Sequence, residues 1–544
     1  MLSGIGVSPG VVVGPVRRVV AAKVEAPVPA NLPQVLDALE KVAQDLDNAA
    51  VHIELEIAKD VLAAQAMMAR DPSLAEVLSG SLSDAIDPDV RTAINSAFAG
   101  FKAALTAIGG YFAERVSDLD EISNRLIAKL AGTESTGLVL TAPSIVVAED
   151  LTPSDTAALN LKFALALVCS KGGPTSHTAI VARGLGIPAI VGCDGAMELS
   201  EGTTLLVDGR SGTVITDPSQ SDIADRTEKE ALFRKRAESV SGPGRLSDGH
   251  AVQLLGNAGT VDDVVAAARV GAEGIGLFRT ELLFLDSQTE PSVAEQVELY
   301  SKVFAAMAGK KVVIRTLDAG SDKPVPYINA IHEENPALGV RGWRLTRTSN
   351  DVLNRQLEAL AQAKAKSDVD LWVMAPMINT PDEAADFASR VNALGMGKAG
   401  VMIETPAAAL HADRVLAEVE FGSFGTNDLT QYIMASDRLD SRLSDMTTAW
   451  HPAVLRAISI AAKSAAELKK PVGVCGEAAA NSHLAAVLVG LGVSSLSMAP
   501  SAIAEVRGFL STVDMATCQK AAAAALAARS SLDSESIAKE ILGH

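Results

Sequence analysis

The sequence has few of the features that mark membrane-bound, secreted or nucleic-acid-binding proteins. No apolar run approaches the roughly 18 residues that a helix needs to cross a bilayer. Residues 1–5 lack the basic and long apolar regions of a signal peptide. The four cysteines show no metal-type or disulfide spacing, which fits a reducing compartment; they are Cys169, Cys193, Cys475 and Cys518. We therefore expect a cytoplasmic protein that does not insert into membranes.

Basic side chains are also in the minority. The chain has 47 Lys and Arg residues against 66 Asp and Glu residues, which gives a net charge of −19. This charge argues against nucleic acid or an anionic membrane as a partner, and a basic protein surface is the more natural complement. At 544 residues the chain is long enough for about two to four domains, each with a sizeable core.

The first 250 residues change character twice. Residues 1–22 and 142–220 contain short β segments broken by Gly and Pro, which predicts one α/β domain. Between them, residues 25–140 carry apolar residues at helical spacing, so we predict an inserted helical bundle. Residues 221–247 form a charged helical stretch that ends in a Ser-Gly-Pro-Gly break, as expected for a linker and hinge.

Residues 248–544 alternate between short apolar runs and helix-length segments. Eight runs qualify as strands: 252–255, 274–278, 311–314, 371–375, 399–403, 421–424, 472–474 and 495–498. Eight such units predict a (β/α)8 barrel, so the whole chain is expected to be a multidomain α/β protein.

Polar residues follow several of these predicted strands. They are Arg279, Arg315, Glu404, Asn427, Asp428 and Cys475. In a barrel these strand ends lie on one face, where active sites are built. A loop ion pair would explain any one of these residues better than catalysis, but six together favour a site.

The region around His177 has a separate pattern. Residues 172–174 are Gly-Gly-Pro, which predicts a tight turn, and Thr175 or Ser176 can then cap a new helix. His177 falls in the first turn of that helix. Unpaired N–H groups and the helix dipole favour an added negative group there and disfavour an imidazolium. A capped turn whose histidine merely packs is the alternative.

The run from Gly172 to His177 resembles the phosphohistidine signature of the PEP-utilising enzymes, in which a Gly-Gly turn and a variable residue precede Thr-Ser-His. Within that family, the whole chain is similar to Enzyme I of the bacterial sugar phosphotransferase system. Pro174 departs from the pattern, since many members carry arginine there. The resemblance implies a swivelling phosphohistidine domain with an inserted bundle, and a C-terminal TIM barrel. It also places Thr156 near the reactive imidazole.

The resemblance further implies a phosphoenolpyruvate–protein phosphotransferase. His177 would take the phosphoryl group at Nε2, releasing pyruvate, and pass it to the histidine phosphocarrier protein HPr. Guanidinium groups bind phosphate and carboxylate in bidentate fashion, and Arg279, Arg315 and Arg438 match arginines that bind the substrate in the family. Lys323 is a weaker candidate, because a surface lysine is the usual interpretation.

Charge on the transferring phosphoryl group calls for a hard cation. Mg²⁺ usually takes one or two carboxylates, and Glu404 and Asp428 lie in motifs that resemble the family's metal site beside the substrate. The resemblance assigns phosphate binding to Asn427. It assigns protonation of the enolate to Cys475, although a lone cysteine is more often a packed side chain.

The inserted bundle corresponds to the docking surface for HPr. Met67 and Met68, beside Arg70 and Asp71, are candidate contacts, although packing explains either methionine alone. The resemblance also implies a homodimer formed through the barrel. Because the nucleophile and the substrate site lie in different domains, we expect a large rotation at the hinge.

Two other functions need consideration. Pyruvate phosphate dikinase and phosphoenolpyruvate synthase share the histidine and the barrel, but they need a nucleotide-binding domain, and no Gly-rich Lys-Ser/Thr loop occurs here. A catalytically silent regulator that binds phosphoenolpyruvate or the carrier would typically lack the nucleophile, an arginine or a metal ligand. None of these is missing from the sequence.

Overall fold

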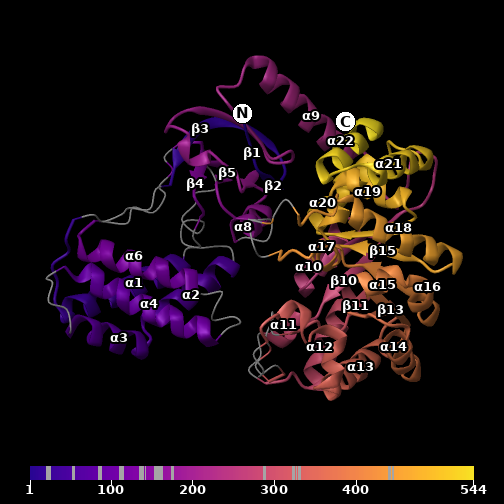
Figure 1. The fold of residues 1–544 in the computed structure, drawn as a ribbon, viewed down its shortest axis with the longest axis horizontal. Helices are drawn as coiled ribbons and strands as arrows, with labels where there is room; N and C mark the ends of the chain where they lie inside the picture. Colours follow the sequence, from indigo (N-terminus) through magenta and orange to yellow (C-terminus); the bar gives the residue numbers. More distant parts are fainter. Residues whose placement is uncertain are drawn as a thin grey trace. The chain divides into compact units, whose positions relative to one another are not determined.

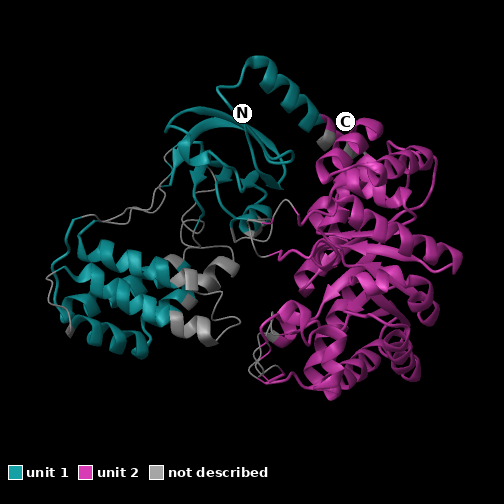
Figure 2. Cartoon of the chain, viewed as in Figure 1, with its two compact units in different colours: residues 1–231 teal, residues 232–544 magenta. Residues whose placement is uncertain are grey.

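The computed structural model describes most of the chain in two compact units, residues 1–231 and 232–544 (Figure 2). The described residues are 1–19, 26–51, 56–83, 89–108, 116–133, 140, 142–151, 163–172, 177–285, 289–320, 325, 327–328, 333–438, 443 and 446–543. Every helix in these ranges is too short or too polar to cross a membrane.

The first unit contains an eight-stranded sheet of order β1-β8-β7-β3-β4-β5-β6-β2. Its strands are β1 (Leu2–Ser3), β2 (Ile5–Ser8), β3 (Val11–Arg18), β4 (Ser144–Ala148), β5 (Ala164–Cys169), β6 (Ala189–Val191), β7 (Thr204–Asp208) and β8 (Thr213–Thr216). The central strands from β3 to β6 are parallel, and the outer pairs are antiparallel. Along β4, Ile145 and Val147 pack on one face and Val146 and Ala148 on the other, so both faces of the sheet are covered.

Helices occupy the sequence between β3 and β4. They are α1 (Leu32–Val51), α2 (Glu56–Ala69), α3 (Pro72–Ser83), α4 (Val90–Ile108) and α6 (Val116–Leu130) (Figure 1). Asn31 and Gln34 start α1 as a capping box, because each side chain accepts the other's backbone N–H at 2.9–3.0 Å. Leu39 and Leu46, which lie two turns apart on α1, are buried in one core with Leu126 of α6.

Helix α9 (Gln220–Ser239) spans the boundary between the two units. Its first half is fixed to the sheet of the first unit by Arg226, which pairs with Asp208 at 2.8 Å, and by Glu230, which pairs with Arg210 at 3.3 Å. Gly244, at the end of the predicted linker, already belongs to the second unit, since its N–H donates to Glu273 at 2.9 Å.

The second unit is a closed barrel of eight parallel strands, which confirms the predicted fold class. The strands are β9 (Gln253–Ala258), β10 (Gly274–Arg279), β11 (Lys311–Arg315), β12 (Asp370–Ala375), β13 (Lys398–Ile403), β14 (Phe421–Phe424), β15 (Val472–Cys475) and β16 (Ser495–Met498). An apolar cluster fills the interior: Leu277, Val313, Trp372, Met374, Met402, Phe421 and Cys475.

Helices cover the outside of the barrel (Figure 1). The main ones are α10 (Val261–Arg269), α12 (Val293–Ala306), α13 (Asn350–Lys364), α14 (Pro381–Ala393), α18 (Pro452–Glu467), α19 (Ser482–Gly490), α20 (Pro500–Leu510), α21 (Met515–Ala527) and α22 (Ser531–Leu542). Capping boxes at Thr260, Ser292 and Thr380 start α10, α12 and α14. Other helices follow the carboxyl ends of strands, among them α11 (Glu281–Leu285), α15 (Pro406–Leu410) and α17 (Thr426–Met434).

Candidate active site

Strand register brings the predicted polar residues to one end of the barrel. Arg279 and Arg315 are register partners at the ends of β10 and β11. Ile403 pairs with Phe424, so Glu404 and Gly425 are the next residues of neighbouring strands. Cys475 ends β15. Because all eight strands are parallel, their carboxyl ends surround a single opening, which we call the barrel mouth.

Arg315 is buried and held by acidic neighbours. It forms an ion pair with Glu281, and its Nη1 lies 3.2 Å from Asp318 Oδ2. Burial by itself lowers the pKa of Arg315, but Glu281, Asp318 and Glu404 outweigh it and raise the pKa above the ordinary value. The guanidinium is therefore permanently charged. Its Nε–H, also buried, has no hydrogen-bond partner in the part of the chain that the structure describes.

A second arginine, Arg341, is the largest of the fully buried side chains and is 1% exposed. Its Nη2 lies 2.8 Å from Asp318 Oδ2, and its Nη1 lies 2.9 Å from Asp428 Oδ1. The other oxygen of Asp428 lies 3.5 Å from Arg438 Nη1. Asp428 is thus held between two arginines in the first turn of α17.

The carboxylate of Glu404 is completely buried. Its Oε1 accepts the Met377 N–H at 2.7 Å, whereas no described residue forms a hydrogen bond with its Oε2. Burial, together with the charges of Asp428 and Asp318, raises the pKa of Glu404 to about 8, against the opposing effect of the arginines. Gly425 leaves room for this carboxylate, because a Cβ at that position would lie 2.7 Å from Oε2.

These carboxylates are suited to hold a hard cation. A cation would supply the partner that Glu404 Oε2 lacks and would offset its repulsion with Asp428. Within the described ranges, no group of three or more His, Cys, Asp or Glu side chains could hold a metal ion. Two carboxylates are nevertheless enough for a cation that completes its shell with water and substrate oxygens.

The thiol of Cys475 lies inside the barrel below the mouth and is 4% exposed. Its sulfur accepts the Ser423 hydroxyl at 3.1 Å, and its S–H donates to the Phe424 carbonyl at 3.6 Å. Burial raises the pKa of the thiol to about 11. The thiol therefore keeps its proton at neutral pH, as a proton donor must.

The remaining predicted residues are placed less completely. Arg279 is exposed at the end of β10, and Asn427 is half-buried in the first turn of α17. His177 is the first residue of α8 (His177–Leu185), as the sequence predicts. Thr178 ties that first turn to the loop after β4, because its hydroxyl donates to Asp150 at 2.9 Å. The side chain of His177 lies outside the described residues, as do Thr156, Pro174 and Lys323.

Sequence reasoning missed four members of the barrel site: Glu281, Asp318, Arg341 and Ser423. Glu281 and Asp318 follow Arg279 and Arg315 by two and three residues, so strand-end position could have indicated both. Arg341 follows no strand, and its one local signal is the next residue, Gly342, whose φ is 58°.

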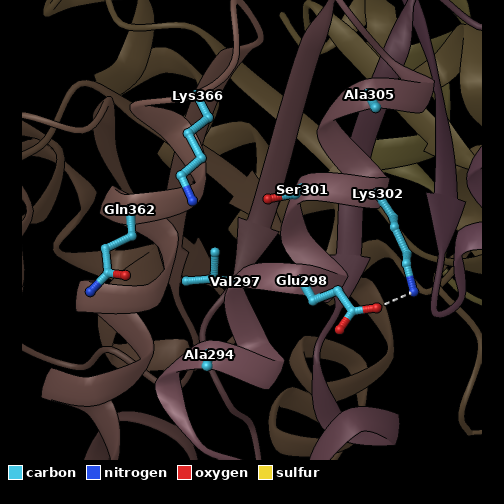
Figure 3. A pocket seen from close by; sticks show the side chains of 8 residues that line it. All are labelled: Ala294, Val297, Glu298, Ser301, Lys302, Ala305, Gln362 and Lys366. Carbon is cyan, nitrogen blue, oxygen red and sulfur yellow. Dashed lines mark hydrogen bonds and ion pairs between the residues drawn. The ribbon is translucent and has the colours of Figure 1, made fainter.

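A surface groove between α12 and α13 contains none of the predicted site residues (Figure 3). Within it Glu298 and Lys302 pair at 2.8 Å, and Ser301, Gln362 and Lys366 are the other polar side chains. The groove therefore gives no reason to move the site from the barrel mouth.

Models of three domains from one enzyme family match successive parts of the chain. The N-terminal domain of the PEP-utilising enzymes matches residues 3–115, their mobile domain matches residues 140–212, and their PEP-binding domain matches residues 234–515. The last match covers most of the barrel.

Curated relatives extend the similarity to the whole chain. A Streptomyces coelicolor protein named phosphoenolpyruvate-protein phosphotransferase is 44% identical over 99% of this chain and 99% of its own. A Bacillus subtilis protein of the same name is 35% identical over 93% of each chain. A multiphosphoryl transfer protein of Xanthomonas campestris is 38% identical over 96% of this chain and 65% of its own.

Proposed function

The chain belongs to the family of PEP-utilising enzymes and acts as a phosphoenolpyruvate–protein phosphotransferase, and we propose that His177 carries the phosphoryl group from phosphoenolpyruvate to HPr. This transfer would be the first step of sugar uptake by the phosphotransferase system. The supporting observation is at the barrel mouth, where a buried donor, Arg315 Nε–H, and a buried acceptor, Glu404 Oε2, both lack partners among the described residues. A phosphate oxygen and a cation would supply what each lacks.

Arg279, Arg315 and Arg438 are the proposed substrate-binding arginines. Arg315 is already oriented by Glu281 and Asp318, so little side-chain entropy is lost when its free Nε–H meets a phosphate oxygen. Arg279 is exposed and can approach a ligand from outside. Asn427, in the first turn of α17, would add an amide donor next to the N–H groups of that helix start.

Glu404 and Asp428 would hold Mg²⁺ beside the substrate. When bound, the ion supplies positive charge that offsets the charge on the phosphoryl oxygens. Ion pairs with Arg341 and Arg438 fix the orientation of the Asp428 carboxylate. Lys323 remains a weaker candidate for substrate binding, and the family resemblance gives Thr156 a supporting role near the imidazole of His177.

The chemistry of the chain's own residues then runs in two steps. The imidazole of His177 attacks phosphorus in line, and the bond from phosphorus to the enol oxygen breaks. Cys475 next gives its proton to C3 of the enolate, and pyruvate forms. This requires the two units to approach and separate, with the proposed hinge in residues 221–247.

The phosphoryl group is proposed to leave at the helical bundle, residues 25–140. Met67 is 74% exposed near the end of α2, whereas Met68 packs against the core of the bundle. Arg70 pairs with Glu40 and Asp47, so it is part of an acidic patch that suits a basic carrier. Met67 is therefore the better candidate contact of the two methionines.

Two further proposals concern the oligomeric state and the cellular compartment. The family resemblance supports a homodimer formed through the barrel. All four cysteines are buried and, in the part of the chain that the structure describes, none forms a disulfide bond, which supports work in the reducing cytoplasm.

Labelled phosphoenolpyruvate, incubated with the protein, Mg²⁺ and HPr, tests the transfer. We expect label on the carrier, and none with His177→Ala. His411→Ala, an exposed histidine beside the barrel, is the matched control and should transfer normally. Binding of phosphoenolpyruvate without transfer would favour the silent regulator, and a requirement for ATP would favour a dikinase or synthase.

A further inference from the structure

The thiol of Cys475 is held between two groups of the neighbouring strand. The Ser423 hydroxyl donates to Sγ at 3.1 Å, and the thiol proton is directed at the Phe424 carbonyl, 3.6 Å away. Both residues belong to β14, which pairs with β15 in register. The position of the sulfur is therefore set by a serine that the reaction scheme above does not use.

We propose that Ser423 is a positioning residue for the proton donor, which fixes the sulfur and remains hydrogen-bonded to it when the proton leaves. This inference rests on the proposed function, in which Cys475 protonates the enolate.

The step itself balances without an external reactant. The S–H bond breaks and a C3–H bond forms from the π electrons between C2 and C3, while the enolate oxygen becomes the carbonyl of pyruvate. A thiolate remains. The proton must first turn away from the Phe424 carbonyl, and the Ser423 hydroxyl holds the sulfur in place while it does so.

The surroundings of the sulfur explain why one hydroxyl matters. The residues packed with Cys475 in the barrel interior are apolar, among them Leu277, Met374 and Met402. Arg315 and Arg279 favour the thiolate through their charge, and Glu404 opposes it. A hydrogen bond to an ionised acceptor is about twice as strong as a neutral one, so the Ser423 contact strengthens as the proton leaves.

The barrel also offers a matched control. Ser497, on β16, is the register partner of Cys475 from the opposite side and is equally buried. The single proton of its hydroxyl has two acceptors within reach, the Gly256 carbonyl at 3.0 Å and Asn257 Oδ1 at 2.6 Å. Both serines therefore lie on strands that neighbour β15, but among the described residues Ser497 forms hydrogen bonds with Gly256 and Asn257 and not with the thiol.

Two measurements on the full chain with Mg²⁺ distinguish a role in positioning the proton donor from a merely structural role. Exchange of pyruvate methyl protons with D₂O, followed by NMR, reports proton transfer at C3, and phosphorylation of His177 by phosphoenolpyruvate reports the preceding step. We expect Ser423→Ala to slow exchange by about 10- to 100-fold, the loss typical of a hydrogen bond to a charged group, and phosphorylation by less than about threefold. Ser423→Thr, which keeps the hydroxyl, should recover most of the exchange, and Ser497→Ala should leave both readouts unchanged.

Three results would overturn the proposal: normal exchange in Ser423→Ala, an equal loss in Ser497→Ala, or a parallel loss of exchange and phosphorylation in Ser423→Ala, which would indicate a structural role. If the unaltered protein failed to phosphorylate His177 at all, the proposed function would be wrong, and the role of Ser423 with it.

Discussion

The two ends of the barrel are built from the same strands but hold opposite kinds of interior. At the carboxyl ends, Arg315, Arg341 and Glu404 are buried together, and two of the polar atoms there, Arg315 Nε and Glu404 Oε2, have no hydrogen-bond partner among the described residues. At the amino ends, the Trp372 ring packs against Phe421 and carries the ammonium groups of Lys311 and Lys398 over it, at 3.6 Å and 4.5 Å from the ring centroid.

This contrast separates function from stability. Trp372 Nε1–H donates to Asp370 at 2.9 Å, so the polar atom of this ring has a partner. We call the cluster of Trp372, Phe421, Lys311 and Lys398 at the amino ends the plug. At the mouth, in contrast, charged side chains are buried. Their burial lowers the stability of the fold and leaves polar atoms available to bind a ligand. Substitutions at the mouth should therefore change the reaction rate per folded molecule, whereas substitutions at the plug should change stability and leave that rate unchanged.

The largest effect is expected for Arg315→Met. We expect phosphorylation of His177 from phosphoenolpyruvate to fall by about 10³-fold or more, because the substrate loses a preorganised cation. Glu281 would also lose its buried ion-pair partner, which costs about 3–5 kcal/mol, whereas Asp318 would keep its ion pair with Arg341.

Phosphorylation of His177 in reverse, from phospho-HPr, is the readout that sharpens the contrast. Under the proposed function this reaction needs only the first unit, so in Arg315→Met it should stay within about twofold. Arg355→Met, which breaks a surface ion pair with Glu290, is the control and should cost less than about 1 kcal/mol. A parallel loss of the reverse reaction would contradict the proposal that the two reactions depend on different units.

Gly425→Ala should have the next largest effect. Its new Cβ would lie 2.7 Å from Glu404 Oε2, so the carboxylate must move. Misplacement of a metal-binding group typically costs about 10- to 100-fold in metal affinity or activity. Titration with Mn²⁺ as a spectroscopic probe, in the absence of substrate, measures this shift. Unchanged affinity would remove Glu404 from the proposed metal site.

Trp372→Ala, at the plug, should act on stability alone. Loss of a buried tryptophan costs about 3–5 kcal/mol of unfolding free energy, measured in urea. The rate of phosphotransfer per folded molecule should stay within about twofold, because the mouth is untouched. If activity fell while the unfolding midpoint stayed constant, the two ends would not be independent.

The effect with the narrowest range of conditions is a pH dependence at the same plug. Burial, together with the charge of Lys398, lowers the pKa of Lys311 from 10.5 to about 8. Between these values the unfolded chain holds a proton that the folded chain has lost, so this lysine makes stability rise with pH from about 8 to 10.5. Lys311→Met should remove the rise in urea midpoints, whereas Lys302→Met, an exposed lysine, should keep it.

The barrel strands were predictable from sequence because strands buried on both faces are continuous apolar runs. Their predicted limits differ from the structure by at most one residue, except that β9 continues to Ala258. The meeting of Arg315, Glu404 and Asp428 followed from topology alone, since parallel strand ends share one face. The partners of these residues did not follow. Arg341 reaches Asp318 and Asp428 from a loop, and the Ser423–Cys475 contact depends on register between strands that are about fifty residues apart in the chain.

The central claim is that phosphoenolpyruvate bound at the barrel mouth transfers its phosphoryl group to a single imidazole of the first unit, that of His177. Mass spectrometry of the protein after incubation with phosphoenolpyruvate and Mg²⁺, under alkaline conditions that preserve phosphohistidine, tests it most directly. The account predicts one phosphoryl group per chain, on His177. A phosphoryl group on any other residue, or none at saturating phosphoenolpyruvate, would contradict it.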